Sequence, residues 1–349
     1  MEDNKFLRLI IALMCALAFV GLLLGAGSVM NTLFAPDDPT ESLISETTAP
    51  TEAPTEPPTE PPTEPPTEPP TEPPTEPPTE PPLAMPQVAQ TAKHSFIYIV
   101  ETDEFLMLKG KENDRIYPAS LTKLFSTYVA LLHMDADTRV TVGGEVYSVT
   151  KDSSKAGLTP GDVLTVRQLV EAMLLPSGND AAMTLAAATG RQLAKNSKLS
   201  YKDAISRFVK EMNATAKTLG LTGSNFKNPD GYHDAGHYTT CREMQIIGKL
   251  ALSQPVIRKA MSTQKVTLDL QYDYPGGWKN TNLLIQPDSE YYNPAALGMK
   301  TGYTRAAGYC LMSAFAYEEK TVLIGVFGCP EIMGRFADAQ NIFNIYTQQ

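Results

Sequence analysis

The chain has 349 residues, 42% of them hydrophobic, and a formal net charge of −10, so its length allows two domains. Most of the acidity lies in residues 1–92, which hold 14 of the 39 acidic and two of the 29 basic side chains. Residues 93–349 therefore carry a net charge of +2. This balance argues against nucleic acid as a partner, because phosphate binding requires a clustered basic face.

The apolar run at residues 9–30 contains no charged side chain and is long enough to span a bilayer. The apolar core of a cleaved signal peptide is shorter and ends at an A-x-A-like site, which Gly25-Ala26-Gly27 matches weakly. Lys5 and Arg8 precede the run, so the positive-inside rule places the N-terminus in the cytoplasm. We therefore expect residues 1–35 to form a cytoplasmic stub and a single-pass anchor. A cleaved signal peptide, which would release the protein, is the alternative.

Residues 36–92 are rich in Pro, Thr and Glu and include seven consecutive Thr-Glu-Pro-Pro units between positions 55 and 82. Proline fixes φ and lacks a donor, and the segment has too little apolar surface to offset the chain entropy of folding. We expect a disordered tether of polyproline II character. A ligand for an SH3-like groove is the less favoured alternative, because such partners are mostly cytosolic and this segment is expected outside.

The cysteines indicate buried thiols. Cys15 lies in the apolar run, and the odd number that remains, Cys241, Cys310 and Cys329, cannot all pair with one another. No CxxC motif or Cys/His cluster has zinc-like spacing, so we expect neither a metal nor another cofactor. Cys310 and Cys329 lie in apolar runs joined by a polar turn, which predicts a hairpin, and a disulfide between them stays open.

Residues 93–349 are numerous enough for one sizeable domain with its own core. Residues 94–101 alternate as a strand does, and residues 105–111 follow after a short polar turn, which predicts a hairpin. Apolar residues then recur at helical spacing from Leu121 to Leu132. Ser120 is therefore expected at the start of a helix.

Ser120 and Lys123 suit nucleophilic catalysis. A serine hydroxyl is a weak nucleophile until a base removes its proton, and Lys123 lies one helical turn further along the same face. Partial burial would lower the lysine pKa so that its neutral amine acts as that base. Free N–H groups at the helix start would favour an oxyanion. In isolation, however, a serine at this position is more often a helix cap.

A second motif, Ser177-Gly178-Asn179, lies between two helical patterns at residues 163–175 and 180–188, with Thr165 as the expected cap of the first. In such a tight loop Ser177 would relay a proton to the leaving group, and Asn179 would orient Lys123 or a substrate amide. Ordinary turn chemistry of Ser, Gly and Asn is the alternative.

A third motif, Lys300-Thr301-Gly302, precedes two strand-like runs at residues 309–316 and 321–328. Gly302 would let a substrate backbone approach a strand edge. Lys300 offers a fixed cation, and the hydroxyls of Thr301 and Thr304 suit a substrate carboxylate. A strand-end turn with a solvated lysine is the alternative.

Together these motifs resemble those of the penicillin-recognising serine enzymes, in particular the D-alanyl-D-alanine carboxypeptidases, also called low-molecular-mass penicillin-binding proteins. The resemblance covers residues 93–349, and its most specific stretches are residues 117–123, 175–182 and 298–309. Weaker matches occur at residues 226–231, 237–240 and 280–284. The ordered set of matches outweighs the alternatives that each motif leaves open in isolation.

The resemblance implies a role for each matching residue. Ser120 would form the acyl-enzyme with Lys123 as general base, and Ser177 and Asn179 would complete the proton network. The implied substrate-binding residues are Lys300, Thr301, Gly302, Tyr303, Thr304 and Arg305. Within this set Lys300 would tune the network, the backbone N–H of Tyr303 would join that of Ser120 as the oxyanion hole, and the two threonines would hold the terminal carboxylate, with Arg305 in addition.

The resemblance also implies an α+β fold of the β-lactamase/transpeptidase type, with an antiparallel sheet flanked by helices and a helical subdomain carrying the Ser177 loop. Residues 333–346 would form a helix covering the sheet, and His233 and His237 are interpreted as loop or packing residues. Glu243 stands where relatives usually have Asp. The Glu-x-x-Leu-Asn motif of one β-lactamase class does not occur, so efficient destruction of β-lactams is not expected.

The main hypothesis is a membrane-tethered D,D-carboxypeptidase that removes the terminal D-alanine from peptidoglycan stem peptides outside a bacterial cell. β-Lactam antibiotics would then be covalent inhibitors. One alternative of the same fold is a β-lactamase or D,D-endopeptidase. Another is a β-lactam-sensing receptor domain, although such receptors usually have several membrane spans and a cytosolic effector.

Overall fold

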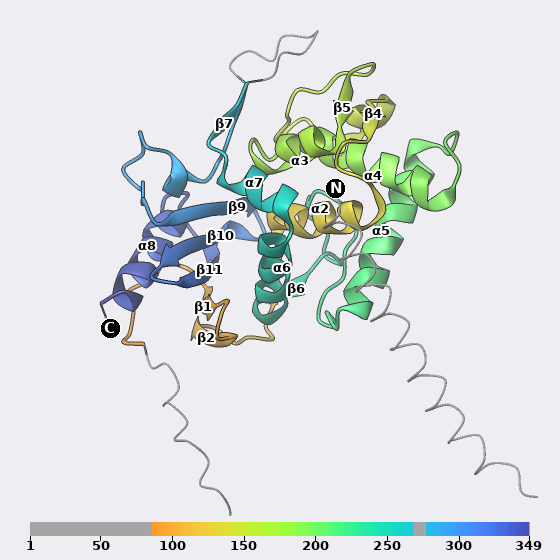
Figure 1. Cartoon of the computed structure of the whole chain (residues 1–349). Coiled ribbons are helices and arrows are strands. Elements are labelled where there is room, and N and C mark those ends of the chain that lie inside the picture. The colour runs from red at the N-terminus through yellow and green to blue at the C-terminus, as the bar shows by residue number, and fades with distance from the viewer. Residues whose placement is uncertain (1–84, 268–276, 349) are drawn as a thin grey trace, which may run out of the picture. The chain divides into compact units, whose positions relative to one another are not determined.

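An antiparallel sheet organises the computed structural model, which describes residues 85–267 and 277–348 (Figure 1). Its five strands lie in the order β2-β1-β11-β10-β9. Their bounds are Glu104–Lys109 for β2, His94–Ile99 for β1, Lys320–Cys329 for β11, Gly308–Tyr317 for β10 and Ala296–Thr304 for β9. The expected hairpins β1–β2 and β10–β11 are both present. No helix within the two described ranges is long and apolar enough to cross a membrane, and the run at 9–30 lies outside them.

Successive side chains of each strand enter different cores, because side chains alternate between the two faces of a sheet. On β1, Phe96 and Tyr98 belong to the larger hydrophobic core, which the sheet shares with the helical subdomain. Ile97 and Ile99 join a smaller core beneath α8 (Gly334–Tyr346). Both faces are therefore covered, and the expected helix over residues 333–346 is confirmed.

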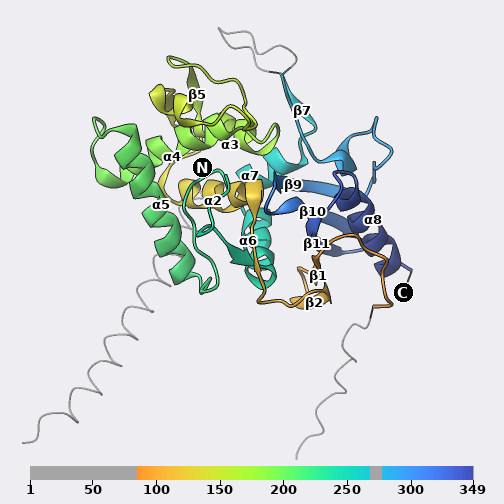
Figure 2. The ribbon, with the colours of Figure 1, turned by 180° about the vertical axis from the view of Figure 1, so that it is seen from behind.

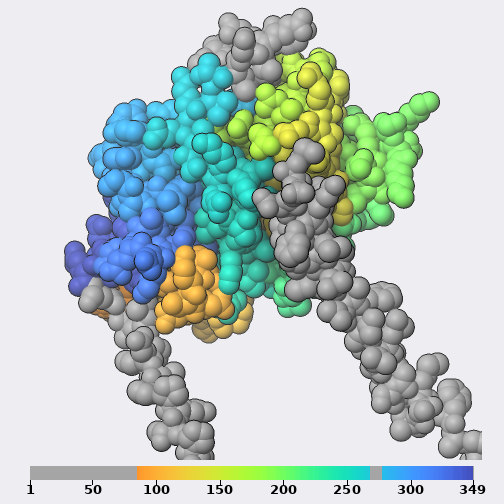
Figure 3. Space-filling view, in the orientation of Figure 1, coloured from red at the N-terminus to blue at the C-terminus, as the bar shows by residue number. Residues whose placement is uncertain are grey.

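The helical part surrounds α2 (Thr122–His133), whose apolar residues Leu124 and Phe125 are fully buried. The other helices are α3 (Val166–Leu174), α4 (Asn179–Ala194), α5 (Tyr201–Thr218), α6 (Cys241–Ser253) and α7 (Pro255–Ser262). Figures 1 and 2 show α4 and α5 on the side of α2 away from the sheet. In the space-filling view of Figure 3, the blue-green α6 and α7 region lies between the blue sheet region and the yellow and green helical region.

Short elements connect these parts. They comprise three 3₁₀ turns, η1 (Ala119–Leu121), η2 (Gly144–Ser148) and η3 (Leu283–Ile285), and three two-stranded pairs. The pairs are β3 (Arg115–Ile116) with β6 (Thr239–Thr240), β4 (Arg139–Thr141) with β5 (Val163–Thr165), and β7 (Lys265–Val266) with β8 (Trp278–Lys279).

One expected helix start is corrected by the structure. The helix expected from residue 163 begins at Val166, because residues 163–165 pair with β4 and Thr165 closes a capping box with Gln168. Ser120 lies at the start of a helix as predicted, in the 3₁₀ turn η1 that continues directly into α2. The cap at Thr165 and the loop before α4 agree with the prediction.

The prediction of buried thiols is confirmed for Cys241, Cys310 and Cys329, all of which are buried and unpaired. Burial raises the pKa of Cys241 to about 12, that of Cys310 to about 11 and that of Cys329 to about 12. Since the thiolate is the reactive form, these thiols are inert at neutral pH.

Candidate active site

A cleft of about 790 Å³ lies where β9, the edge strand of the sheet, meets the helical part. Its wall contains eight of the ten predicted site residues: Ser120, Ser177, Asn179, Thr301, Gly302, Tyr303, Thr304 and Arg305. The other two, Lys123 and Lys300, are fully buried. The structure thus brings residues from three distant motifs together.

Lys123 lies beneath Ser120 because α2 continues directly from η1. Its Nζ is 3.0 Å from Ser120 Oγ, 2.7 Å from Asn179 Oδ1 and 2.8 Å from the carbonyl oxygen of Asp230. An ammonium donates to all three oxygens. A neutral amine keeps two donors for Asn179 and Asp230 and turns its lone pair toward the serine hydroxyl. The arrangement therefore suits both protonation states.

The charge state of Lys123 is governed by burial. Desolvation lowers the pKa of Lys123 to about 8, although the Asp230 and Asp180 carboxylates oppose this shift. A lysine with a pKa near 8 supplies a useful fraction of neutral amine at physiological pH. The lowered pKa therefore agrees with the predicted role of Lys123 as a general base.

The Ser177 loop is held rigidly against the start of α4. Ser177 has φ of +65°, in the left-handed region that serine rarely occupies. The Asp180 carboxylate accepts hydrogen bonds from the backbone N–H groups of residues 156–158, and Asn179 N–H donates to the Ser154 carbonyl. These bonds fix the loop so that Ser177 and Asn179 face the cleft.

Strand β9 brings the third motif to the nucleophile. Lys300 Nζ donates to the Thr301 carbonyl at 2.9 Å, and burial together with the charge of Lys123 holds the Lys300 pKa well below its usual range. The Thr301 hydroxyl pairs with that of Thr281 at 2.7 Å. A side chain at Gly302 would place its Cβ 3.2 Å from Ser120 N and 3.1 Å from the Pro118 carbonyl. Glycine therefore lets β9 approach η1 closely.

The sequence reasoning missed Arg335, which reaches the cleft from α8. Its Nη1 donates to the Gly302 carbonyl at 3.2 Å, while its buried Nε has no hydrogen-bond partner. No carboxylate of the described residues forms an ion pair with it. Burial lowers the pKa of Arg335, but a guanidinium remains charged. One signal in the sequence could have indicated Arg335: it is a charged residue among the apolar residues of a helix that was expected to cover the sheet.

Tyr232, His233 and Asp152 form another part of the cleft wall that was not predicted. His233 packs edge-on against Tyr117 with ring centroids 4.9 Å apart. The Tyr232 hydroxyl lies 3.5 Å from both carboxylate oxygens of Asp152. Nothing in the spacing of these loop residues indicated that they meet.

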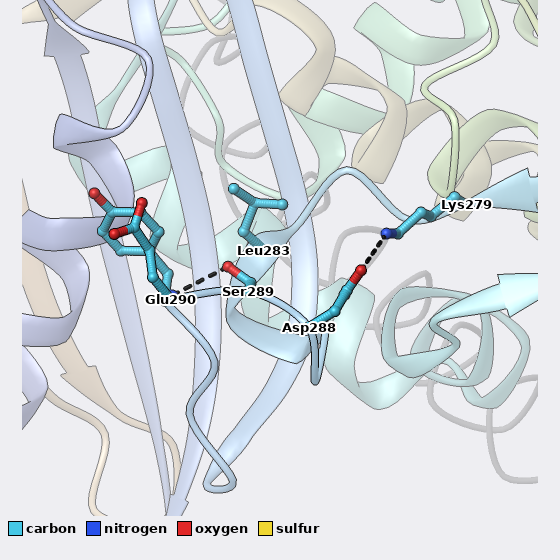
Figure 4. Close-up of a pocket in the computed structure, with 6 residues that line it drawn as sticks. Lys279, Leu283, Asp288, Ser289 and Glu290 are labelled. Atoms are coloured by element: carbon cyan, nitrogen blue, oxygen red, sulfur yellow. Dashed lines mark hydrogen bonds and ion pairs between the residues drawn. The ribbon is translucent and has the colours of Figure 1, made fainter.

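A smaller pocket of about 300 Å³ contains none of the predicted site residues. Figure 4 shows that Lys279 and Asp288 point toward each other there, and their charged atoms are 3.2 Å apart. Both side chains are largely exposed, so the pair is screened by water. Within the described ranges, no three His, Cys, Asp or Glu side chains gather as metal ligands would.

Comparison with known proteins bears on the family and the fold of the chain. The sequence model of the D-alanyl-D-alanine carboxypeptidase family matches residues 82–330. The chain is 30% identical over 267 residues to D-alanyl-D-alanine carboxypeptidase DacF of Bacillus subtilis, covering 75% of this chain and 64% of that relative. It is 34% identical over 236 residues to a D-alanyl-D-alanine carboxypeptidase of Streptomyces sp. K15, covering 64% of this chain and 77% of that relative.

The crystal structure of the Streptomyces K15 DD-transpeptidase superposes with a TM-score of 0.67 at 29% identity, covering 76% of this chain and 100% of that one. This likeness confirms the predicted α+β fold of the β-lactamase/transpeptidase type. Motifs, geometry and likeness all agree, and the chain belongs to the D-alanyl-D-alanine carboxypeptidase family, peptidase family S11.

Proposed function

We propose that the chain is a serine D-alanyl-D-alanine carboxypeptidase that removes the terminal D-alanine from peptidoglycan stem peptides. The observation that carries the proposal is the 3.0 Å contact between the buried Lys123 amine and Ser120 Oγ at the floor of the cleft. Such a pair is what a serine needs to become a nucleophile.

In the acylation step, neutral Lys123 takes the Ser120 proton while Oγ attacks the carbonyl carbon of the penultimate residue. The carbonyl oxygen becomes an oxyanion, which the backbone N–H groups of Ser120 and Tyr303 would stabilise. When the C–N bond breaks, the Ser177 hydroxyl gives its proton to the departing D-alanine nitrogen and recovers one from Lys123. A peptidyl ester on Ser120 remains.

In the deacylation step, Lys123 removes a proton from a water molecule, and the resulting hydroxide attacks the ester carbonyl. The Ser120 oxygen leaves and regains its proton, so the shortened peptide departs with a new carboxylate. If an amine replaced water, the outcome would be transpeptidation, the activity named for the Streptomyces K15 structure.

The terminal carboxylate of the substrate would lie at the cationic side of the cleft. Arg335 has an unpartnered buried Nε there, and the hydroxyls of Thr301 and Thr304 lie on the same wall. Arg305 is exposed at the rim. A buried guanidinium binds a carboxylate more strongly than an exposed one does, because water screens it less.

β-Lactams would bind covalently at the same serine. They present a reactive amide carbonyl beside a carboxylate, as the peptide does, and ring opening would leave an ester on Ser120. The described geometry offers Lys123 to activate Ser120 but no separate carboxylate against the Ser120 hydroxyl. We therefore expect a long-lived adduct, in contrast to a β-lactamase.

Cellular location forms a second part of the proposal. Residues 9–30 would hold the protein in a bacterial cell membrane, and the Pro-rich segment from residue 36 would extend the catalytic domain into the wall. Support comes from the sequence alone: the uncharged apolar run, the basic residues before it and the Pro-rich repeats after it.

Residues 85–92, which were predicted to be part of this tether, belong to the catalytic domain instead. Met85 and Val88 pack against the core beneath α8, and the Asp338 carboxylate accepts hydrogen bonds from the N–H groups of Thr91 and Ala92.

Mass spectrometry with a diacetyl-Lys-D-Ala-D-Ala peptide, and separately with penicillin, tests the activity. We expect release of one D-alanine and a persistent penicillin adduct on Ser120, and Ser120→Ala should lose both. The exposed Ser253→Ala is the matched control. Rapid loss of penicillin from the adduct would indicate a β-lactamase, and cleavage only of cross-linked dimers an endopeptidase. A stable adduct without peptide turnover would indicate a sensor.

The rate constant of penicillin acylation should rise about tenfold per pH unit below pH 8 and level off above it, because only deprotonated Lys123 accepts the serine proton. Asp230→Asn should move the rise of the rate constant to lower pH, since the Asp230 carboxylate raises the Lys123 pKa. Stopped-flow acylation between pH 6 and 10 measures both. A profile that keeps rising to pH 10 would contradict a Lys123 pKa lowered to about 8.

Arg335→Gln should lower kcat/KM for a peptide with a free terminal carboxylate by roughly 10- to 100-fold, because a charge-assisted bond is lost. The same peptide with a terminal carboxamide should be affected much less. Arg305→Gln, which changes an exposed arginine on the same cleft wall, is the control and should have a smaller effect. Equal losses for acid and amide would argue against carboxylate binding by Arg335.

Deletion of residues 9–30 should move the protein from the membrane fraction, where it resists alkaline extraction, to the soluble fraction. In intact cells without an outer membrane, added protease should digest the catalytic domain of the full chain. The intact mass of the membrane-bound protein distinguishes an anchor, which is retained, from a signal peptide, which is removed. A mature protein lacking these residues would contradict the anchor.

A further inference from the structure

A directed chain of hydrogen bonds runs behind the nucleophile from a loop of the helical part. The backbone N–H of Lys227 donates to His237 Nδ1 at 3.2 Å. His237 Nε2 lies 2.9 Å from Thr122 Oγ1, and Thr122 Oγ1 lies 2.8 Å from the Ala119 carbonyl oxygen. The bonds thus connect residue 227 to the residue before Ser120.

The direction of each bond is determined by its ends. A backbone N–H only donates, so His237 Nδ1 accepts and the imidazole proton is on Nε2. His237 therefore donates to Thr122 Oγ1, whose own proton goes to the Ala119 carbonyl, which only accepts. His237 is buried and packs edge-on against Phe226, and burial lowers the pKa of His237 to about 4, so the neutral tautomer persists at neutral pH.

The last hydrogen bond of this series, from Thr122 to the Ala119 carbonyl, controls the orientation of one peptide group. The Ala119 carbonyl and the Ser120 N–H belong to the same planar trans peptide, so they point in opposite directions. A bond that holds the carbonyl toward Thr122 therefore holds the Ser120 N–H toward the cleft. Thr122 N–H also bonds to this carbonyl but shares its hydrogen with the Ser120 carbonyl.

The backbone at this point needs external support. Ala119 has φ of +49°, which costs an alanine free energy and persists only when its surroundings enforce it. The Gly231 backbone packs so closely that a Cβ there would lie 1.8 Å from the Ala119 carbonyl oxygen. The Thr122 hydroxyl and the Gly231 backbone thus hold the same carbonyl.

We infer that His237 and Thr122 are positioning residues that aim the backbone N–H of Ser120 at the oxyanion of the acylation step. The inference rests on the proposed acyl-enzyme function. Both side chains act through the Ala119–Ser120 peptide and touch no substrate atom. Their effect should therefore appear in the rate of bond formation and not in the binding that precedes it.

Thr122→Val and Thr122→Ser form the first test, because valine matches threonine in shape and lacks the hydroxyl. Stopped-flow acylation by penicillin over a range of concentrations separates the acylation rate constant from the dissociation constant of the pre-covalent complex. We expect Thr122→Val to lose roughly 10- to 100-fold in the rate constant with an unchanged dissociation constant. Thr122→Ser should stay within about threefold of the parent.

His237 offers a matched pair. Glutamine can place its amide nitrogen where Nε2 lies and donate to Thr122, whereas asparagine reaches only the Nδ1 position. We expect His237→Gln to restore most of the acylation rate that His237→Asn loses. Thr122→Val combined with His237→Asn should be no slower than the slower single variant, since both interrupt one chain.

The outcomes separate this inference from the proposed function. If the parent protein forms no Ser120 adduct, the proposed function fails. If the parent acylates but Thr122→Val acylates equally fast, or weakens only pre-covalent binding, the positioning inference alone is overturned. If Thr122→Val has a lowered melting temperature, the His237 pair decides: equal losses for Gln and Asn would indicate a structural role and overturn the inference.

Discussion

Burial of the Lys123 amine against three fixed oxygen acceptors is the constraint on which the site depends. In water this amine would be protonated with a pKa of 10.5 and useless as a base at neutral pH. Its acceptors come from Ser120, three residues away, and from Asn179 and Asp230, which are 56 and 107 residues away. The helical part of the fold brings these segments together. The packing of α2 and α4 therefore determines the burial and the hydrogen bonds of Lys123 Nζ.

The sheet supplies the other half of the site through a close backbone approach. Gly302 lets β9 lie against η1, and the Arg335 guanidinium, from the helix that covers the opposite core, donates to the Gly302 carbonyl. Helix α8 therefore does more than shield Ile324 and its neighbours from water. It contributes a cation to the cleft, and its position depends on the register of β10 and β11 beneath it.

Local patterns allowed most of the fold and the motif residues of the site to be predicted. The alternating run at residues 94–101 and the polar turn after it predicted β1 and β2, two strand-like apolar runs predicted β10 and β11, and Thr165 was predicted as the cap of α3. Arg335 and the His237–Thr122 contact were not predicted, because they depend on which helix and loop faces meet after folding. The roles given to Ser177, Lys300 and Arg305 stay predictions, since the structure gives the positions of these residues and not their effect on the reaction.

Three buried basic side chains, Lys123, Lys300 and Arg335, lie at or behind the cleft, and no described carboxylate forms an ion pair with any of them. Burying unpaired positive charge costs free energy, which a fold optimised only for stability would avoid. Desolvation lowers the pKa of each group, and a ligand carboxylate would supply the missing countercharge. The same burial that weakens the fold thus makes Lys123 a base and prepares Arg335 to receive an anion, so stability and reactivity at this site are opposed.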